Sequence, residues 1–288
     1  MRKCPGEDMK DIYFETEGKD VVGIYSLNNP LLVVRDPELI KTIVVKDFNY
    51  FPDQGICVDE ETDHLTAHLF FLGGTKWKGL CQKLTPTFTS RKMRAMFGIA
   101  RDCAQILADA TPAGSVVEVR ELIARYATDV IASCAFGIDV DSQHNPEAEF
   151  QTSKTLTTKE VAAQAWMFFL AGFETSSTTV SFCLYELARH PDIQKKVQEE
   201  IDVVLKKNNV DVTYDIIMTQ MPYLEKVVNG MRFGLMQMKL AMVHLLSKFY
   251  FLPVGDKQSK LRMAPDNVVL TPIGGIDLRV EHRRMSVS

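Results

Sequence analysis

A carboxylate and an alcohol are neighbours in the middle of an apolar stretch of the chain, at Glu174 and Thr175. The residues from Val161 to Leu170, just before them, are apolar at almost every position. An unpaired charge in such surroundings is costly, so Glu174 needs a partner or a role. A positioned carboxylate and hydroxyl can transfer protons, which makes Glu174 and Thr175 candidate catalytic residues.

Signals for one long helix enclose these two residues. Thr157 can cap a helix start, and Glu160 follows it at the spacing of a capping box. His190 precedes Pro191, and the residue before a proline is disfavoured in a helix. About 33 residues between these signals give a helix roughly 50 Å long. Because it is apolar on most sides in its first half, we expect this helix to run through a core.

Gly172 interrupts the helical pattern, because glycine costs about 1 kcal/mol relative to alanine inside a helix. Two interpretations fit this irregularity. In one, another helix crosses closely at Gly172 and Glu174 forms a salt bridge. In the other, the helix widens into a groove where a ligand lies flat beside the carboxylate and the hydroxyl. These residues by themselves do not favour either interpretation.

The stretch Ala171-Gly172-Phe173-Glu174-Thr175-Ser176 resembles the oxygen-activating central helix of the cytochrome P-450 family of haem-thiolate monooxygenases. The longer segment 168–193 is similar to the insect detoxification branch of that family. The resemblance implies that Glu174 and Thr175 relay protons and that Ala171 and Gly172 bind the haem cofactor. It also implies haem-dependent oxidation of lipophilic small molecules, an NADPH-dependent reductase as partner, and the cytosolic face of the endoplasmic reticulum membrane as location.

The composition bears on nucleic-acid binding, on the state of the cysteines and on membrane anchoring. The net charge of −4 indicates no general affinity for nucleic acid. The six cysteines are scattered without a CxxC motif, which is typical of reduced thiols. No apolar run approaches the roughly 20 residues that span a bilayer, whereas microsomal members of the resembling family begin with such an anchor. We therefore predict no transmembrane anchor in this chain, which leaves a cytoplasmic location open.

The resemblance extends over three blocks and implies a mainly α fold with small β regions. Residues 1–150 are the predicted N-terminal β-region and early helices, and residues 151–229 hold the central helix and those after it. Residues 230–288 are predicted to form the helix after the haem-ligand loop and a C-terminal β-hairpin. Within the blocks we expect a hairpin of 21–25 with 31–34, helices at 93–110, 119–136, 191–205, 212–218 and 231–251, and a hairpin of 268–270 with 276–280 around Gly274-Gly275.

Trp77 is the candidate haem-binding residue of the first block. The segment from Thr75 to Cys81 resembles one in which the family places a tryptophan and, four residues later, an arginine that both hold a haem propionate. Here Cys81 stands at the arginine position, and a thiol cannot make the charge-assisted contact that arginine makes. A tryptophan in the core would explain Trp77 equally well.

Two joins separate the blocks. Only about twenty residues link the signature Cys134–Asp139 to Thr157, too few for the helices of the family's substrate lid. At the second join, Gly230–Gly234 resembles the residues just after the haem-ligating cysteine, and Val228 stands at the position of that cysteine. Haem-thiolate chemistry needs a cysteine thiolate, so we predict no metal ligand and an incomplete fold without lid helices or haem-ligand loop.

Two further patterns are weaker. His64 and His68 have the spacing of metal ligands on one helix face, but no clear third ligand accompanies them. Glu186 and Arg189 resemble the Glu-x-x-Arg pair of the family, but they lie at the end of the central helix instead of in a later one. We interpret them as a surface ion pair.

These observations predict a truncated, internally deleted member of the family that is catalytically inactive because haem iron has no ligand, so that haem binding is doubtful. A working haem enzyme of reduced size is one alternative. A hydrophobic-ligand or partner-binding remnant without enzyme activity is the other. In each case the missing segments would leave apolar helix surface uncovered.

Overall fold

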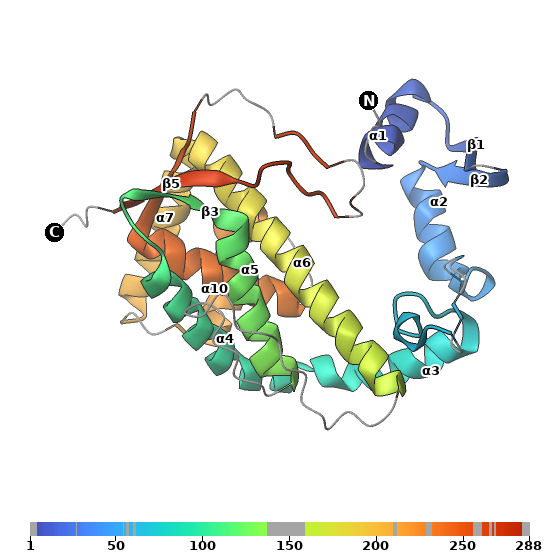
Figure 1. Ribbon diagram of the computed structural model, residues 1–288, viewed down its shortest axis with the longest axis horizontal. Coiled ribbons are helices and arrows are strands. Elements are labelled where there is room, and N and C mark those ends of the chain that lie inside the picture. The colour runs from blue at the N-terminus through green and yellow to red at the C-terminus, as the bar shows by residue number, and fades with distance from the viewer. Residues whose placement is uncertain are drawn as a thin grey trace.

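The computed structural model describes residues 5–26, 28–53, 55, 58–59, 62–136, 159–209, 212–228, 232–255, 261–264, 267 and 269–283. Most of them are helical, with two small antiparallel sheets, which confirms the predicted fold class. Figure 1 shows the larger helices gathered in one body, with the N-terminal elements at one side of it. None of the helices in the described ranges has the length and apolar character required to span a bilayer.

The predicted central helix is α6, Lys159–Arg189, and it crosses the molecule as a single element (Figure 1). It ends one residue before His190-Pro191, and Pro191 starts α7, Pro191–Lys207. Proline is well placed there because its fixed backbone angle suits a first helical turn. The predicted capping box lies outside the residues whose side chains are described. The existence, length and end of this helix are as the sequence predicts.

The core forms where α6 packs against two helices, which in turn pack against a third. These are α4 (Ser90–Ala110), α5 (Val119–Ile131) and α10 (Arg232–Lys248). Elements from all three predicted blocks therefore share one core. In α4 and α5 the buried residues recur mostly at every third or fourth position, so one face is buried, whereas residues 236–243 of α10 are buried at every position. Fully buried residues of this core include Leu107, Val130, Leu184, Met236, Leu240 and Leu246.

A three-stranded sheet covers one end of the helical body. Its strands are β3 (Ser115–Glu118), β4 (Phe249–Pro253) and β5 (Asp277–His282), in the order β3-β5-β4. Both neighbours of β5 are antiparallel to it. Leu278 and Val280 point into the core, while the residues between them are exposed, as expected for a sheet with one wet face.

Two predictions in this region are wrong. The strand containing Ile276–Val280 does not form a hairpin with 268–270, because the distant segments β3 and β4 supply both of its partners. Leu270 is half exposed in a loop, and Val268 lies outside the described residues. The helix expected over 231–251 ends at Lys248, where the chain continues as β4 and buries Phe249 and Phe251.

The hairpin predicted near the N-terminus is present. Strands β1 (Val21–Ser26) and β2 (Asn29–Val34) pair antiparallel, after the helix α1 (Pro5–Glu15). Asp36 then caps α2 (Pro37–Lys41), because its carboxylate accepts a hydrogen bond of 2.7 Å from the Leu39 backbone. The last helix before the core is α3, Gly74–Leu84.

Two short helices lie between α7 and α10 in the chain, and charged side chains of α7 and α10 bind to them. They are α8 (Tyr214–Thr219), where the sequence predicts a helix over 212–218, and α9 (Pro222–Val227). The Glu200 carboxylate accepts two hydrogen bonds of 2.8 Å from the first backbone amides of α9. The ammonium of Lys239, fully buried in α10, lies 2.9 Å from the Glu225 carboxylate and 3.2 Å from the Ile217 carbonyl. A buried lysine needs such partners.

We expect Leu184→Ala to destabilise the protein strongly, because it leaves a cavity in the core between α6 and its neighbours. Loss of the transfer energy and the new cavity together cost about 2–5 kcal/mol. Val203→Ala on α7 is the control: Val203 is 65% exposed, and its truncation should change the free energy of unfolding by less than about 0.5 kcal/mol. Urea titration followed by circular dichroism measures both, and equal effects would contradict the described core.

Candidate functional site

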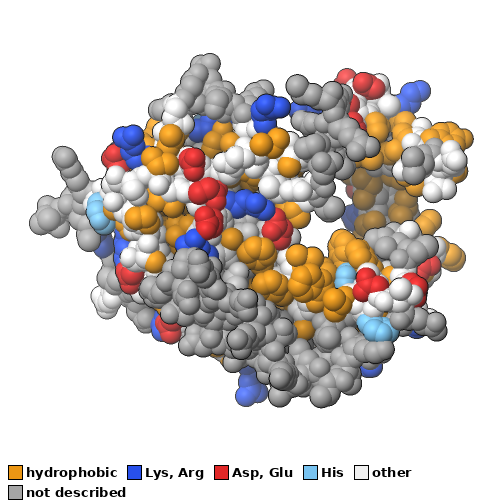
Figure 2. Space-filling model, viewed as in Figure 1, with side chains coloured by type: hydrophobic (Ala, Val, Ile, Leu, Met, Phe, Trp, Pro, Cys, Tyr) orange, Lys and Arg blue, Asp and Glu red, His pale blue; other side chains and the backbone are white. Residues whose placement is uncertain are grey.

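Glu174 is paired with a cation from the neighbouring helix. The Arg120 guanidinium, in the first turn of α5, lies 2.5 Å from the Glu174 carboxylate. The side chains of both are about a quarter exposed. With Glu118 and Glu121 they line a cavity of about 220 Å³. Figure 2 shows acidic and basic side chains together over this part of α5 and α6.

Gly172 lies where α5 packs closely against α6. A Cβ atom at Gly172 would overlap with Cδ1 of Ile131, so a side chain fits there only if the Ile131 side chain moves. From the other side, the Gln237 amide of α10 donates to the Gly172 carbonyl at 3.3 Å and to the Ser176 hydroxyl. Both features of the first interpretation, the close crossing and the ion pair at Glu174, are therefore present.

Thr175 faces away from this crossing and is exposed. Its hydroxyl donates to the Ala171 carbonyl one turn earlier, and the Thr179 hydroxyl likewise donates to the Thr175 carbonyl at 2.8 Å. Hydroxyl side chains in helices often bond in this way. The Glu174 carboxylate is thus bound to Arg120, while the Thr175 hydroxyl is bound to its own helix. Their predicted roles in proton transfer, and the haem contacts of Ala171 and Gly172, stay predictions.

Trp77 lies on a different element from the other predicted site residues. It is on α3, which lies near the start of α6, whereas Glu174 is in the middle of that helix (Figure 1). The Trp77 ring packs against Phe48, with 5.4 Å between ring centroids. Cys81 follows one turn later on the same helix. The contact with Phe48 agrees with Trp77 as a packed aromatic residue, and its predicted contact with haem is untested.

Val228, at the predicted position of the haem-ligating cysteine, is completely buried at the end of α9. Its backbone amide donates to the Leu224 carbonyl at 2.9 Å, and its side chain packs in the core. An isopropyl group in this position offers no lone pair to a metal. Within the described parts of the chain, no three histidine, cysteine or acidic side chains lie close enough to hold a metal ion.

The cysteines that the structure describes are the other candidates for a thiolate ligand. Burial raises the pKa of Cys134 and of Cys183 to about 11, and it also raises the pKa of Cys81. Cys103 is buried in α4. Because burial favours the protonated thiol, these three cysteines are not activated as thiolates in the surroundings that the structure describes. Val228, at the position that the resemblance assigns to the ligand, does not fit a thiolate-bound haem.

The two weaker patterns also have structural explanations. His64 starts a short 3-10 turn, His64–Thr66, so it does not share an α-helix face with His68. His68 is buried, which lowers its pKa, and its Nδ1 accepts a hydrogen bond of 3.2 Å from the Phe70 amide. Glu186 and Arg189 form an ion pair of 3.6 Å, which confirms the predicted surface pair.

Comparisons with a family model and with known proteins point to the same family. The model of the cytochrome P450 family matches residues 5–154 and 148–229. This chain belongs to the cytochrome P450 family. Family membership implies haem iron as cofactor. The two matched segments overlap at 148–154, the place where the sequence predicts the first join, and the second segment ends at 229, next to the second join.

Relatives of known sequence come from Drosophila melanogaster. The chain is 34% identical over 292 residues to a probable cytochrome P450 6a20, a match that covers 72% of the chain and 58% of that protein. It is 32% identical over 306 residues to cytochrome P450 6a2, covering 75% and 60%. It is 31% identical over 333 residues to a probable cytochrome P450 6a13, covering 88% and 66%. The chain thus spans about three fifths of the first two relatives.

The missing positions are internal to the first match. Since 72% of 288 residues is about 207, roughly 85 of the 292 matched positions have no counterpart in this chain. This shortfall agrees with an internally deleted chain.

Sequence reasoning missed two residues that organise the site, Arg120 and Gln237. Arg120 lies 54 residues before Glu174, and nothing in its local pattern marks it as the partner. Gln237 is a polar residue between Met236 and Met238 in α10, and it is almost completely buried. A polar position of that kind was the one available signal, because a buried amide must find hydrogen-bond partners.

Gly172→Ala should destabilise the protein although alanine is the better helix former. The new methyl group would overlap with Ile131, and overpacking of this kind costs about 1–3 kcal/mol. Gly98→Ala in α4 is the matched control, since a Cβ atom there would meet no other side chain or helix within 4 Å, and it should stabilise by up to about 1 kcal/mol. Ile131→Val should partly rescue Gly172→Ala. Thermal unfolding of the four proteins tests this, and equal shifts for both glycines would contradict the close crossing.

The buried thiols predict an alkaline loss of stability. The pKa of Cys183 is about 11 in the folded protein against an ordinary value of 9.0, so the folded state holds this proton more tightly. Its contribution is complete below pH 9 and is lost as the pH rises from about 9 to about 11. Cys183→Ala should therefore flatten this part of the pH dependence in urea titrations under reducing conditions. Cys81→Ala, which changes a less buried thiol, should leave it nearly unchanged, and a wild-type curve parallel to that of Cys183→Ala would contradict the assignment.

Proposed function

We propose that this chain is a cytochrome P450 family member that does not catalyse haem-dependent monooxygenation of lipophilic small molecules. The observation that carries the proposal is Val228, a buried apolar residue at the position where the resemblance places the haem-ligating cysteine. Since a thiolate ligand is required for that chemistry, the residues around Val228 cannot supply it.

The surroundings of Glu174 support the same proposal. A carboxylate that relays protons must be able to exchange them with the reacting group. The Glu174 carboxylate is instead neutralised by Arg120 at 2.5 Å, as in a structural ion pair. The Thr175 hydroxyl is bound to the Ala171 carbonyl. In this chain both residues act through packing and hydrogen bonds within the helical body.

The expected redox partner changes with this proposal. Family resemblance implies an NADPH-dependent reductase and the cytosolic face of the endoplasmic reticulum membrane. Without an iron ligand, electrons from a reductase have no acceptor in the chain. We therefore propose that the reductase is not a functional partner here.

A second candidate function is binding of a hydrophobic ligand or a partner protein without catalysis. One observation favours it: the first half of α6 leaves large apolar side chains uncovered, with Trp166 49% exposed and Leu170 43% exposed. Phe88, which is also exposed, lies near Phe168 of this helix with 5.6 Å between ring centroids. Figure 2 shows a broad apolar area on this face of the molecule. Exposed areas of this kind are typical of binding surfaces.

The chain expressed with a haem supply should show no thiolate-type absorbance when it is reduced under carbon monoxide. Val228→Cys should not restore this signal, because the residues of the ligand loop are absent as well. An intact family member purified in the same way is the positive control. A thiolate-type spectrum from the unmodified chain would overturn the proposal, whereas a spectrum from Val228→Cys alone would show that only the ligand was missing.

A further inference from the structure

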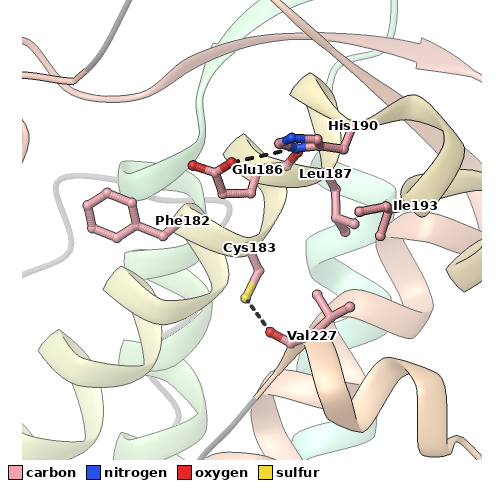
Figure 3. A pocket seen from close by; sticks show the side chains of 7 residues that line it. All are labelled: Phe182, Cys183, Glu186, Leu187, His190, Ile193 and Val227. Carbon is pink, nitrogen blue, oxygen red and sulfur yellow. Dashed lines mark hydrogen bonds and ion pairs between the residues drawn. The ribbon is translucent and has the colours of Figure 1, made fainter.

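Many charged side chains of the helical body lie in ion pairs. The Arg94 guanidinium of α4 lies 2.6 Å from the Asp215 carboxylate of α8. At the end of α6, the Glu186 carboxylate lies 3.6 Å from Nδ1 of His190 (Figure 3). Exposed charges of one sign that gather without such partners are therefore a distinct feature of the surface.

The segment of α3 and early α4 carries only positive charge. Residues 64–101 include seven lysines and arginines and no aspartate or glutamate, although the whole chain has a net charge of −4. These seven are Lys76, Lys78, Lys83, Arg91, Lys92, Arg94 and Arg101. Lys83, Arg91 and Lys92 are exposed, and none of the three forms an ion pair within the described parts of the chain.

An apolar side chain lies between these three charges in the chain. Lys83 is in the last turn of α3, and Arg91 and Lys92 are in the first turn of α4. Phe88 ends the 3-10 turn Thr85–Phe88 that connects the two helices, and it is 39% exposed. We call Lys83, Phe88, Arg91 and Lys92 the basic surface. An apolar centre with a polar rim is the usual arrangement of a protein interface.

Helix α1 has the complementary character. Asp8, Asp11 and Glu15 follow one another at intervals of three and four residues, so they lie along one face of this helix. Asp8 and Glu15 are exposed, and neither forms an ion pair within the residues that the structure describes. Phe14 is three residues from Asp11, which places it beside the same face, and it is 65% exposed.

The basic surface and the acidic face of α1 do not meet within one chain. Figure 1 shows α1 and α3 at opposite ends of the N-terminal elements, with α2 between them. In the described ranges no other helix or strand packs extensively against α1. Both surfaces are therefore available to a second molecule, and covering their exposed aromatic side chains would be favourable.

We propose that the basic surface of one chain binds α1 of a second copy of this chain. Charge complementarity carries the proposal, since the carboxylates on one face of α1 match the cations around Phe88, and complementary charge selects a partner and its orientation. Phe14 supplies an apolar side chain that can cover Phe88. The contact joins two different surfaces, so it closes into a dimer where a two-fold axis places each α1 on the other chain. The proposal does not depend on whether the chain binds haem.

Sedimentation velocity of the full chain at low ionic strength tests the association directly. The mass should rise above that of the monomer as the protein concentration increases through the micromolar range. Added salt should reduce the association, because charges are screened beyond about 10 Å at about 0.1 M ionic strength. A wild-type chain that stays monomeric at every concentration would overturn the proposal.

Charge reversal on either surface should weaken the association about tenfold or more. One variant combines Arg91→Glu with Lys92→Glu, and the other combines Asp8→Lys with Glu15→Lys. Carboxylates suit the first turn of α4, where they complement the helix dipole, so the first variant should fold as the wild type does by circular dichroism. Wild-type association in either variant would place the contact elsewhere, for example on the exposed first half of α6, and would overturn the proposal.

An equal mixture of the two reversed variants should associate again. The mixture offers an intact α1 to an intact basic surface, and the two reversed surfaces are also complementary to each other. The matched control reverses Lys196 and Lys206, two exposed lysines of α7, to glutamate and should associate like the wild type. If the mixture stays monomeric although both variants are folded, α1 is not the partner of the basic surface and the proposal is wrong.

Discussion

The contact of α6 with α5 and α10 at Gly172 is the constraint on which the helical body depends. A missing side chain lets Ile131 approach the α6 backbone, and one buried amide, Gln237, holds that backbone from the other side. The Tyr126 hydroxyl of α5 donates to the Gln237 carbonyl at 2.8 Å, so the three helices are connected through one residue. Such polar links inside a core are specific, because an unpaired buried amide is costly.

Local sequence signals were sufficient for most helices and insufficient for the long-range pairings. Pro191 and the apolar run before Gly172 predicted α6, and the alternation of Leu278 and Val280 predicted a strand. The partners of that strand could not be predicted, since 158 residues separate β3 from β5 and 23 residues separate β4 from β5. The partner of Glu174 was hidden for the same reason: charge alone does not identify which arginine approaches.

The structure separates the family's scaffold from the family's chemistry. The central helix has the apolar surface, the glycine and the Glu174-Thr175 pair on which the resemblance rests, although Val228 stands at the position that the resemblance assigns to the metal ligand. A fold does not imply a function, because function depends on particular side chains placed on it. In this chain the residues that hold the helices together are present, and a valine stands where the resemblance places the residue that holds iron.

The ion pair between buried Lys239 and Glu225 has a consequence for the connection between α9 and α10. The ion pair joins α9 to α10. In the sequence only a few residues separate Val228, at the end of α9, from Arg232, at the start of α10. With the helices fastened in this way, the length of the connecting loop affects the fold mainly through closure entropy, which rises by only about 0.6 kcal/mol for each doubling. Long segments could therefore be gained or lost at this point during evolution while α9 and α10 kept their places.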